Sequence, residues 1–310
     1  MPFEQKVEAH HVLKYTGNCK IALQLTTCPF ENTVTRVDAS GEAMSAADYV
    51  GKVKAERTDG SQNRSNPEIR GKNSRRWLIR PNQARVGAHI DKVETFDMIK
   101  DPTSKIVAGY AAAMKQVQSE IILGVEEADN GKFVLADGGI MGTSLEGKRP
   151  GAAREKLPSK YRTAHNSERL TLDKLINARE VLALSDNSFE QGEVYMAHSP
   201  YETTDLLKIA AATESSLNAF EQKQLADGKI TSLMGFTFIE TNMLPTVSGA
   251  RWCPIWTKSN ILAGYWQDIK TYLWNNPAQQ NLPYAFMDLY LDVVRGEDAS
   301  VHVIETQVAA

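Results

Sequence analysis

The sequence has few of the features that mark secreted, membrane or disulfide-stabilised proteins. It holds only three cysteines, Cys19, Cys28 and Cys253, with no close pair among them. This odd count is typical of reduced thiols and argues against a disulfide framework or a zinc site. No apolar run approaches the roughly 20 residues of a membrane helix, and the first residues lack the apolar stretch of a secretion signal. These absences favour a cytosolic origin and no membrane partner.

Residue patterns for metal binding or catalysis are also lacking. None of the six histidines has metal-ligand spacing or belongs to a helical His-x-x-x-His pair. The glycine-rich stretch 142–149 nearly matches a phosphate-binding loop, but Arg149 stands where a Ser or Thr is needed to hold magnesium. Pro150 and Gly151 follow where a helix should begin. We therefore interpret the stretch as a turn and expect no cofactor, no metal and no catalytic residues.

What the chain does have is an uneven distribution of charge. Residues 51–85 contain ten Lys or Arg and three acidic residues, a local balance of +7. Because the whole chain carries −3, the remainder carries −10. Between Ala55 and Arg76 the only aliphatic residue of any size is Ile69, too little to pack a core. We expect this basic segment to rest on a neighbouring surface, while a pI near 6.1 argues against bulk binding of duplex DNA.

Apolar periodicity predicts the secondary structure of the first half. Residues 33–37 alternate like a short strand in an extended arm, and residues 75–80 are typical of a strand that returns from the basic segment. The basic segment should therefore be a long hairpin with a polar tip. The pair Asp101-Pro102 indicates a helix start. Over the next five turns one apolar stripe follows, formed by Val107, Tyr110, Met114, Val117 and Ile121.

The second half alternates between helix and strand patterns. Thr171 can cap a helix in which four apolar side chains share a face: Leu172, Leu175, Ile176 and Leu182. Residues 194–197 indicate a buried strand, so a compact α/β or α+β domain is expected. The alternating residues 287–293 and the segment 301–304 predict a closing hairpin. We expect Trp252, Trp256, Trp266 and Trp274 to fill a core rather than to bind a ligand.

The order of these segments resembles the major capsid proteins of tailed bacteriophages with the Hong Kong 97 type fold. The likeness is carried by the basic loop ending at 74–79, the helix at 101–124, the helix start at 170–175, the segment 227–239, and residues 252–256 with the closing hairpin. The resemblance implies an α+β fold with an N-terminal arm (1–45), an extended loop (46–90), a peripheral domain (91–165 and 251–310) with a spine helix (102–124), and an axial α/β domain (166–250).

The resemblance also implies a function. A member of this family is a structural subunit, not an enzyme, and its copies form the pentamers and hexamers of an icosahedral shell around double-stranded DNA. Its partners would be copies of itself, a scaffolding protein and a portal, with only weak non-specific contact to the packaged DNA. The protein would be located in the virion capsid after assembly in the host cytoplasm.

The charge pattern adds a hypothesis about the contact between copies. Exposed ion pairs contribute only about 0–1 kcal/mol each, so the arginines would set the register while apolar packing near Trp77 stabilises the contact. The residues expected there are Arg57, Arg64, Arg70, Arg75, Arg76, Trp77 and Arg80. Two other interpretations stay open: an encapsulin-like nanocompartment shell of the same fold, and a small-molecule enzyme with a glycine-rich ligand loop near Gly142.

Overall fold

The computed structural model describes residues 26–49, 74–89, 103–151, 154–185, 193–212, 230–279 and 281–308. The chain divides into two compact units. Unit 1 contains Met1–Cys28, Pro81–Ser119 and Gln267–Leu291. Unit 2 contains Pro29–Arg80, Glu120–Trp266 and Asp292–Ala310. The domain boundaries expected from the resemblance stay a prediction.

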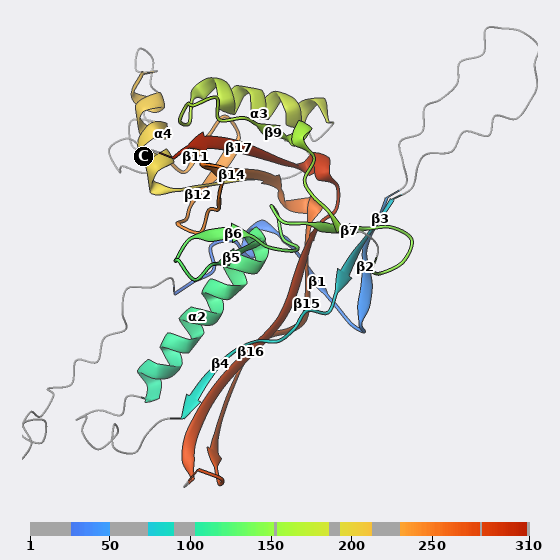
Figure 1. Ribbon diagram of the computed structural model, residues 1–310, viewed down its shortest axis with the longest axis vertical. Helices are drawn as coiled ribbons and strands as arrows, with labels where there is room; N and C mark the ends of the chain where they lie inside the picture. Colours follow the sequence, from blue (N-terminus) through green and yellow to red (C-terminus); the bar gives the residue numbers. More distant parts are fainter. Residues whose placement is uncertain are drawn as a thin grey trace, which may run out of the picture. The chain divides into compact units, whose positions relative to one another are not determined.

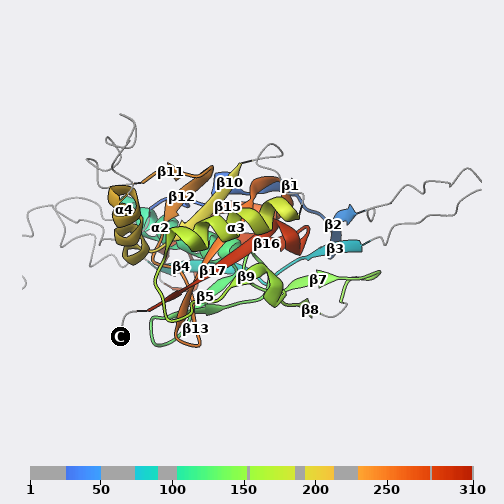
Figure 2. The same ribbon diagram turned by 90° about the horizontal axis from the view of Figure 1, so that it is seen from above.

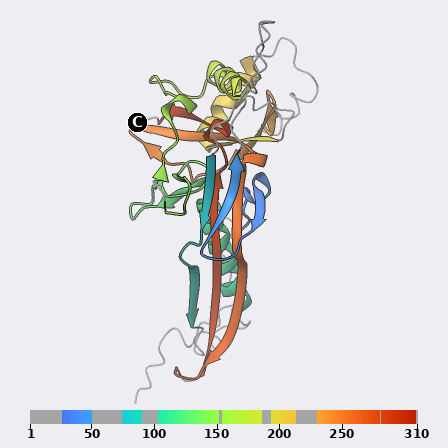
Figure 3. The same ribbon diagram turned by 90° about the vertical axis from the view of Figure 1, so that its right-hand side faces the viewer.

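Two long strands, β15 (Ile261–Asn276) and β16 (Leu282–Arg295), pass through both units as neighbours in one sheet (Figure 3). In unit 2, β1 (Thr35–Asp38) pairs in parallel with the first residues of β15. In unit 1, β4 (Ala84–His89) pairs antiparallel with β16. The strand predicted at 287–293 is confirmed, because alternate side chains of β16 are buried as its period-two pattern requires.

The predicted closing hairpin is wrong. Residues 301–304 do belong to a strand, β17 (Val301–Gln307), but β17 pairs with strands of a different sheet from β16. The 16-residue strand β15 takes the place of the expected hairpin partner. Alternation identifies a strand and its buried face, but it says nothing about which backbone lies alongside.

A seven-stranded mixed sheet forms the core of unit 2, and helix α3 (Leu172–Leu184) lies along it (Figures 1 and 2). The strand order is β11 (Ser232–Leu233), β12 (Phe236–Glu240), β10 (Val194–His198), β14 (Ala250–Thr257), β17 and β9 (Arg162–Thr163), with β13 (Thr246–Val247) paired to β14. Trp252 and Trp256 of β14 are buried, as expected of core residues. A run of buried residues this continuous is typical of a strand covered on both faces.

Helix α3 begins where the sequence predicts, but it turns a different face to the core. The Oγ1 atom of Thr171 accepts a hydrogen bond from the backbone of Lys174 at 3.4 Å, which confirms the predicted cap. Leu175 and Leu182 are buried, whereas Leu172 and Ile176 are 38% and 46% exposed. The buried ammonium group of Lys174 explains the difference, because it donates hydrogen bonds to four main-chain carbonyl groups under the helix.

Helix α2 (Thr103–Leu123) confirms the helix predicted at 102–124. It ends at Gly124, whose φ of +76° places it in the left-handed region that favours glycine after a helix. In the single chain Met114 is buried, while Val107, Tyr110, Val117 and Ile121 are half-buried. The proposed packing role of this stripe therefore stays a prediction. None of the described helices is long and apolar enough to cross a membrane.

The remaining helix and strands are short. Helix α4 (Pro200–Ala212) follows β10 directly, and β5 (Val125–Glu127) and β6 (Phe133–Leu135) form a two-stranded ladder after α2. Residue Phe30, next to the 3₁₀-helix η2 (Glu31–Thr33), is fully buried and lies beside the ring of Trp256. Residues 29–38 are thus packed into unit 2. Residues 1–25 lie outside the described part of the chain.

Candidate assembly site at the base of the basic hairpin

The two ends of the basic segment pair with each other. Strands β2 (Ala43–Tyr49) and β3 (Ser74–Ile79) are antiparallel, with Tyr49 opposite Ser74. They join β7 (Ser144–Glu146) and β8 (Arg154–Glu155) in a four-stranded sheet of unit 2. The predicted hairpin is therefore confirmed at its base. Its tip, with Arg57, Arg64 and Arg70, lies outside the described residues.

The side chains of β3 alternate between the two faces of this sheet. Arg76 and Leu78 are buried, with 4% and 0% of their surface exposed, whereas Arg75 is exposed and Trp77 half-buried. This period of two is what a strand backbone imposes. The exposed face of the strand can therefore meet another molecule, and the buried face belongs to the subunit itself.

Arg75 holds the exposed face of the hairpin together. Its Nη2 atom donates to Oδ2 of Asp48 at 2.9 Å, and its Nε atom bonds to the other carboxylate oxygen. Hydrogen bonds from Arg75 and then from Ser45 lower the pKa of Asp48, so this carboxylate stays ionised at neutral pH. The guanidinium carbon of Arg75 lies 5.4 Å from the ring centroid of Trp77, within cation–π range.

Trp77 and Arg80 complete the exposed side. The indole Nε1 atom of Trp77 donates to the carbonyl group of Gly147 at 2.8 Å, which fixes the ring against the segment after β7. The backbone N–H of Arg80 donates to the carbonyl group of Glu42 at 2.9 Å, while the side chain of Arg80 is exposed. These contacts tie β3 to the segment after β7 and to residue Glu42 before β2.

Arg76 lies inside the subunit. Its Nη2 atom is 3.2 Å from a carboxylate oxygen of Glu146 and 3.1 Å from one of Asp298. Among the described residues, its Nε and Nη1 atoms have no hydrogen-bond partner. Arg76 is therefore part of the subunit's own fold, and its side chain is turned away from the exposed face of the hairpin.

Asp298 connects the hairpin to the glycine-rich loop. Its second carboxylate oxygen lies 3.2 Å from the Nε atom of Arg295, which is fully buried. The Nη1 atom of Arg295 donates to the carbonyl group of Ile140 at 3.0 Å and also bonds to that of Gly142. The loop therefore turns its carbonyl groups toward a guanidinium group and leads into strand β7. Residues 144–146 form strand β7, so the interpretation of the stretch 142–149 as a turn is wrong for its middle residues.

Glycine is required at this loop by the close approach of two backbones. A Cβ atom added to Gly142 would lie 2.1 Å from the carbonyl oxygen of Gly138, and one added to Gly139 would lie 2.3 Å from the nitrogen of Gly124. Real Cβ atoms do not come this close, so no other residue fits without moving the chain. The glycines bring the end of α2 and this loop together.

A second carboxylate, Asp292, anchors the end of β3. Its Oδ2 atom accepts from the backbone N–H of Ile79 at 2.9 Å, and its Oδ1 atom accepts from that of Val293. Burial raises the pKa of Asp292 to about 6, although both hydrogen bonds and Arg154 favour the ionised form. Next to it, Leu78 packs so closely on Gly264 that an added Cβ would lie 2.7 Å from its Cδ1.

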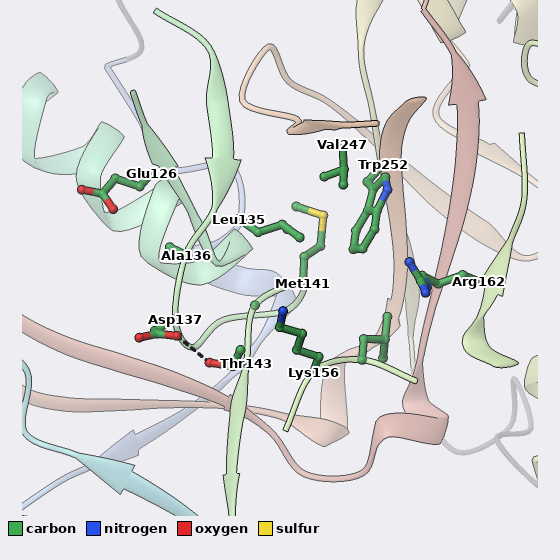
Figure 4. Close-up of a pocket in the computed structure, with 12 residues that line it drawn as sticks. Glu126, Leu135, Ala136, Asp137, Met141, Thr143, Lys156, Arg162, Val247 and Trp252 are labelled. Carbon is green, nitrogen blue, oxygen red and sulfur yellow. Dashed lines mark hydrogen bonds between the residues drawn. The ribbon is translucent and has the colours of Figure 1, made fainter. Parts of the chain in front are cut away.

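A pocket of about 630 Å³ lies next to the glycine-rich loop (Figure 4). Leu135, Met141, Val247 and Trp252 form its apolar wall, and the guanidinium carbon of Arg162 lies 5.2 Å from the Trp252 ring centroid. The twelve lining residues include no histidine, cysteine or serine, so the pocket holds no nucleophile paired with a histidine base. In the described part of the chain, no cluster of three His, Cys, Asp or Glu side chains is arranged to hold a metal ion.

Sequence reasoning missed the four charged residues that fasten the hairpin: Glu146, Asp292, Arg295 and Asp298. Arg295 continues the apolar run of β16, and a cation inside a buried strand is a signal for a buried ion pair. Its partner could not be named from the sequence. The expectation for Trp274 was wrong, because this side chain is 45% exposed rather than part of a core.

Comparisons with known proteins give a consistent result. A family model described as "Phage capsid protein" matches residues 7–307. The capsid of Ralstonia phage GP4 is 12% identical, with 100% of this chain and 98% of that chain covered and a TM-score of 0.65. The Cyanophage Pam1 capsid is 11% identical, with 96% of each chain covered and a TM-score of 0.67. The capsid of the native GTA particle is 10% identical, with 94% of each covered and a TM-score of 0.65.

No curated protein matches the sequence. At such low identity the structural likeness concerns the fold, and it confirms the expected α+β capsid fold. The family match extends over nearly the whole chain and includes the hairpin base, the pocket and both long strands.

Proposed function

Since the chain belongs to the phage capsid protein family, we propose that its copies build an icosahedral shell of pentamers and hexamers through contacts of the basic hairpin. The protein is a major capsid protein, a structural component of the virion. The shell would enclose double-stranded DNA and would be assembled in the host cytoplasm. Its role would be structural and not enzymatic.

The observation that carries this proposal is the unbalanced charge of the hairpin. Arg75 and Arg76 already have carboxylate partners within the chain. The proposed contact with a neighbouring copy therefore rests on Arg57, Arg64, Arg70 and Arg80, together with the half-exposed ring of Trp77. The rest of the chain carries a charge of −10, so an identical copy offers the opposite charge.

The small free energy of each contact between copies would let a growing shell release wrongly placed subunits. Each exposed ion pair contributes only about 0–1 kcal/mol, so a single contact is reversible. Closed symmetry repeats the contact at every subunit, and many weak contacts together give a stable particle. A scaffolding protein and a portal would be further partners. Packaged DNA would contact the lining only weakly, because it must remain free to leave.

Charge reversal tests this function. The triple variant Arg57→Glu, Arg64→Glu and Arg70→Glu should give a folded subunit that no longer forms closed shells in negative-stain electron microscopy. A matched control reverses Lys132, Lys148 and Arg149, which are exposed on the body and change the net charge equally. The control should still form shells. Normal particles from the hairpin variant, or equal loss in both variants, would contradict the proposed role of the hairpin.

A further inference from the structure

The pocket beside the glycine-rich loop is built mainly by three separate segments of unit 2 (Figure 4). Residues 135–143 form one side, residues 156–162 form a second, and Val247 and Trp252 of the β13–β14 hairpin form a third. Its volume of about 630 Å³ lies within the range of small-molecule sites, roughly 300–1,000 Å³. The contact proposed between copies does not use this pocket.

One wall of the pocket is apolar and adaptable. Leu135, Met141, Val247 and Trp252 face the same space in Figure 4. Methionine is unbranched and polarisable, so its side chain can adjust to ligands of varied shape. Among these four side chains only the indole N–H of Trp252 is a hydrogen-bond donor. This wall therefore suits a flexible hydrocarbon better than a nucleotide base, which needs several hydrogen bonds.

Two cationic side chains complete the lining. Lys156 is exposed and Arg162 is half-buried, and both point into the pocket in Figure 4. The guanidinium carbon of Arg162 lies over the ring of Trp252, and its Nη1 atom is 3.7 Å from a carboxylate oxygen of Glu305, beyond hydrogen-bond distance. Among the described residues the Nε atom of Arg162 has no hydrogen-bond partner. This guanidinium group therefore keeps hydrogen-bonding capacity for a ligand.

The two acidic residues of the lining leave these cations available. The carboxylate group of Asp137 accepts a hydrogen bond from Oγ1 of Thr143 at 2.8 Å and lies 3.5 Å from Nη1 of Arg154. The side chain of Glu126 points away from Arg162 in Figure 4. An anionic group beside Arg162 would therefore meet positive charge. Because the lining as a whole contains two acids and two bases, it favours a ligand with a single negative charge.

We propose that this pocket binds a fatty acid. Its carboxylate group lies on Arg162 and Lys156, and its hydrocarbon chain lies against Met141 and Trp252. The planar guanidinium group can donate two parallel hydrogen bonds to a carboxylate, and the ammonium group adds a point charge. The apolar wall removes the hydrocarbon chain from water. All twelve lining residues belong to unit 2 of one chain, so this site does not depend on shell assembly.

A bound fatty acid would reinforce the base of the basic hairpin. The glycine-rich loop lines the pocket with Met141, and the carbonyl group of Gly142 in the same loop bonds to Arg295. Arg295 in turn shares the carboxylate group of Asp298 with Arg76 of β3. A ligand that ties this loop to β14 opposes its opening. Because such a ligand binds only the folded chain, it raises the free energy of unfolding.

Isothermal titration calorimetry of the purified full-length protein tests the proposal. Decanoate is the ligand, and decylamine and 1-decanol carry the same chain with other head groups. Decanoate should bind one site per subunit and raise the temperature of thermal unfolding. The other two should bind weaker by roughly tenfold or more, because neither offers a carboxylate group to Arg162. Decanoate that does not bind, or binds no tighter than decylamine, would overturn the proposal.

Variants that remove charge locate the carboxylate group. Arg162→Gln with Lys156→Gln should weaken decanoate binding by roughly tenfold or more. The control, Lys148→Gln with Lys160→Gln, removes the same charge from exposed lysines outside the pocket lining. Its affinity for decanoate should stay unchanged. An unchanged affinity in the pocket variant, or an equal loss in both variants, would contradict the proposed carboxylate site.

Photolabelling of the unsubstituted chain tests the site without any variant. A decanoic acid with a terminal diazirine group should label peptides that contain Met141, Val247 or Trp252, as identified by mass spectrometry. Excess decanoate should abolish this labelling, and excess decylamine should not. Tyr272 and Trp274 are 40% and 45% exposed and report non-specific adhesion to apolar surface. Labelling mainly at these two residues, or pocket labelling that decanoate does not displace, would overturn the proposal.

Discussion

Arg76 and Asp298 are separated by 222 residues in the sequence, and yet their side chains meet at 3.1 Å inside unit 2. The same carboxylate group also accepts from Arg295, which in turn bonds to carbonyl groups of the glycine-rich loop. One aspartate therefore fastens strand β3, the end of β16 and the loop before β7. The base of the hairpin is fixed by this buried network, and only its outer face is available to a neighbouring copy.

Loss of Asp298 should weaken the fold strongly. Asp298→Ala leaves the buried guanidinium groups of Arg76 and Arg295 short of a partner, and removing one member of a buried ion pair costs about 3–5 kcal/mol. Urea unfolding of the unassembled subunit measures this loss. Asp48→Asn, which breaks the exposed pair with Arg75, is the control and should hardly change the midpoint. Equal shifts in the two variants would contradict a special role for the buried pair.

Asp292 should make the subunit more stable in mild acid. Its pKa is about 6 in the folded chain and near 3.8 in the unfolded chain. Its contribution is therefore fully present below pH 3.8 and is lost as the pH rises through 6. Relative to Asp292→Asn, the wild-type free energy of unfolding should rise as the pH falls from 7.5 to 5, by up to about 1.4 kcal/mol per pH unit below 6. If the difference in unfolding free energy between wild type and Asp292→Asn does not change with pH, the raised pKa of Asp292 is refuted.

His302 should have the opposite effect over nearly the same range. It is buried, its Nε2 atom lies 2.8 Å from Oγ1 of Thr163, and burial lowers its pKa from 6.5 to about 4. Its contribution is present above pH 6.5 and is lost as the pH falls through 4, because the unfolded imidazole binds the proton first. Relative to His302→Gln, wild-type stability should decrease from pH 7.5 to 5, measured by the same urea titrations. If wild-type stability relative to His302→Gln instead increases as the pH falls, the His302 ring is protonated in the folded chain.

Gly142 should not tolerate even a methyl group. In Gly142→Ala the new Cβ would lie 2.1 Å and 2.3 Å from the carbonyl oxygens of Gly138 and Ala136, so the loop around Arg295 must open. We expect little soluble subunit from this variant in an expression and gel-filtration assay. Gly151→Ala is the control: its φ of +88° costs about 1–2 kcal/mol, but no atom lies within 4 Å. Similar yields from both variants would contradict the steric argument.

Local patterns in the sequence were a good guide to single elements. The Asp-Pro start and the apolar period of 3.6 residues predicted α2, and Thr171 predicted the first turn of α3. The returning strand β3 and the alternating strand β16 were also predicted, because an element with one covered face carries that face in its own residues. The resemblance in segment order led to the correct family and fold class.

The same patterns failed where partners had to be chosen. The alternation of residues 287–293 was read as half of a closing hairpin, but β15 is the neighbour of β16 and β17 lies in another sheet. Arg76 was expected at the contact between copies from its position in a basic run; its strand turns the side chain toward Glu146 and Asp298 of the same chain, and the contact itself stays a prediction. Trp274 was expected in a core because of its residue type, but its side chain on strand β15 is 45% exposed.

The amino-acid sequence alone determined the start of α2 and α3, the alternating strands β3 and β16, and the separation of a basic segment from an acidic body. These depend on neighbouring residues, whose spacing is fixed by the backbone. The tertiary structure alone decided that Asp298 and Asp292 bind strand β3 at the base of the basic hairpin. It also decided that the rings of Tyr272, Trp274, Tyr284 and Phe286 lie together. Such contacts join residues far apart in the chain, and their distances depend on how whole sheets are ordered, which no local pattern specifies.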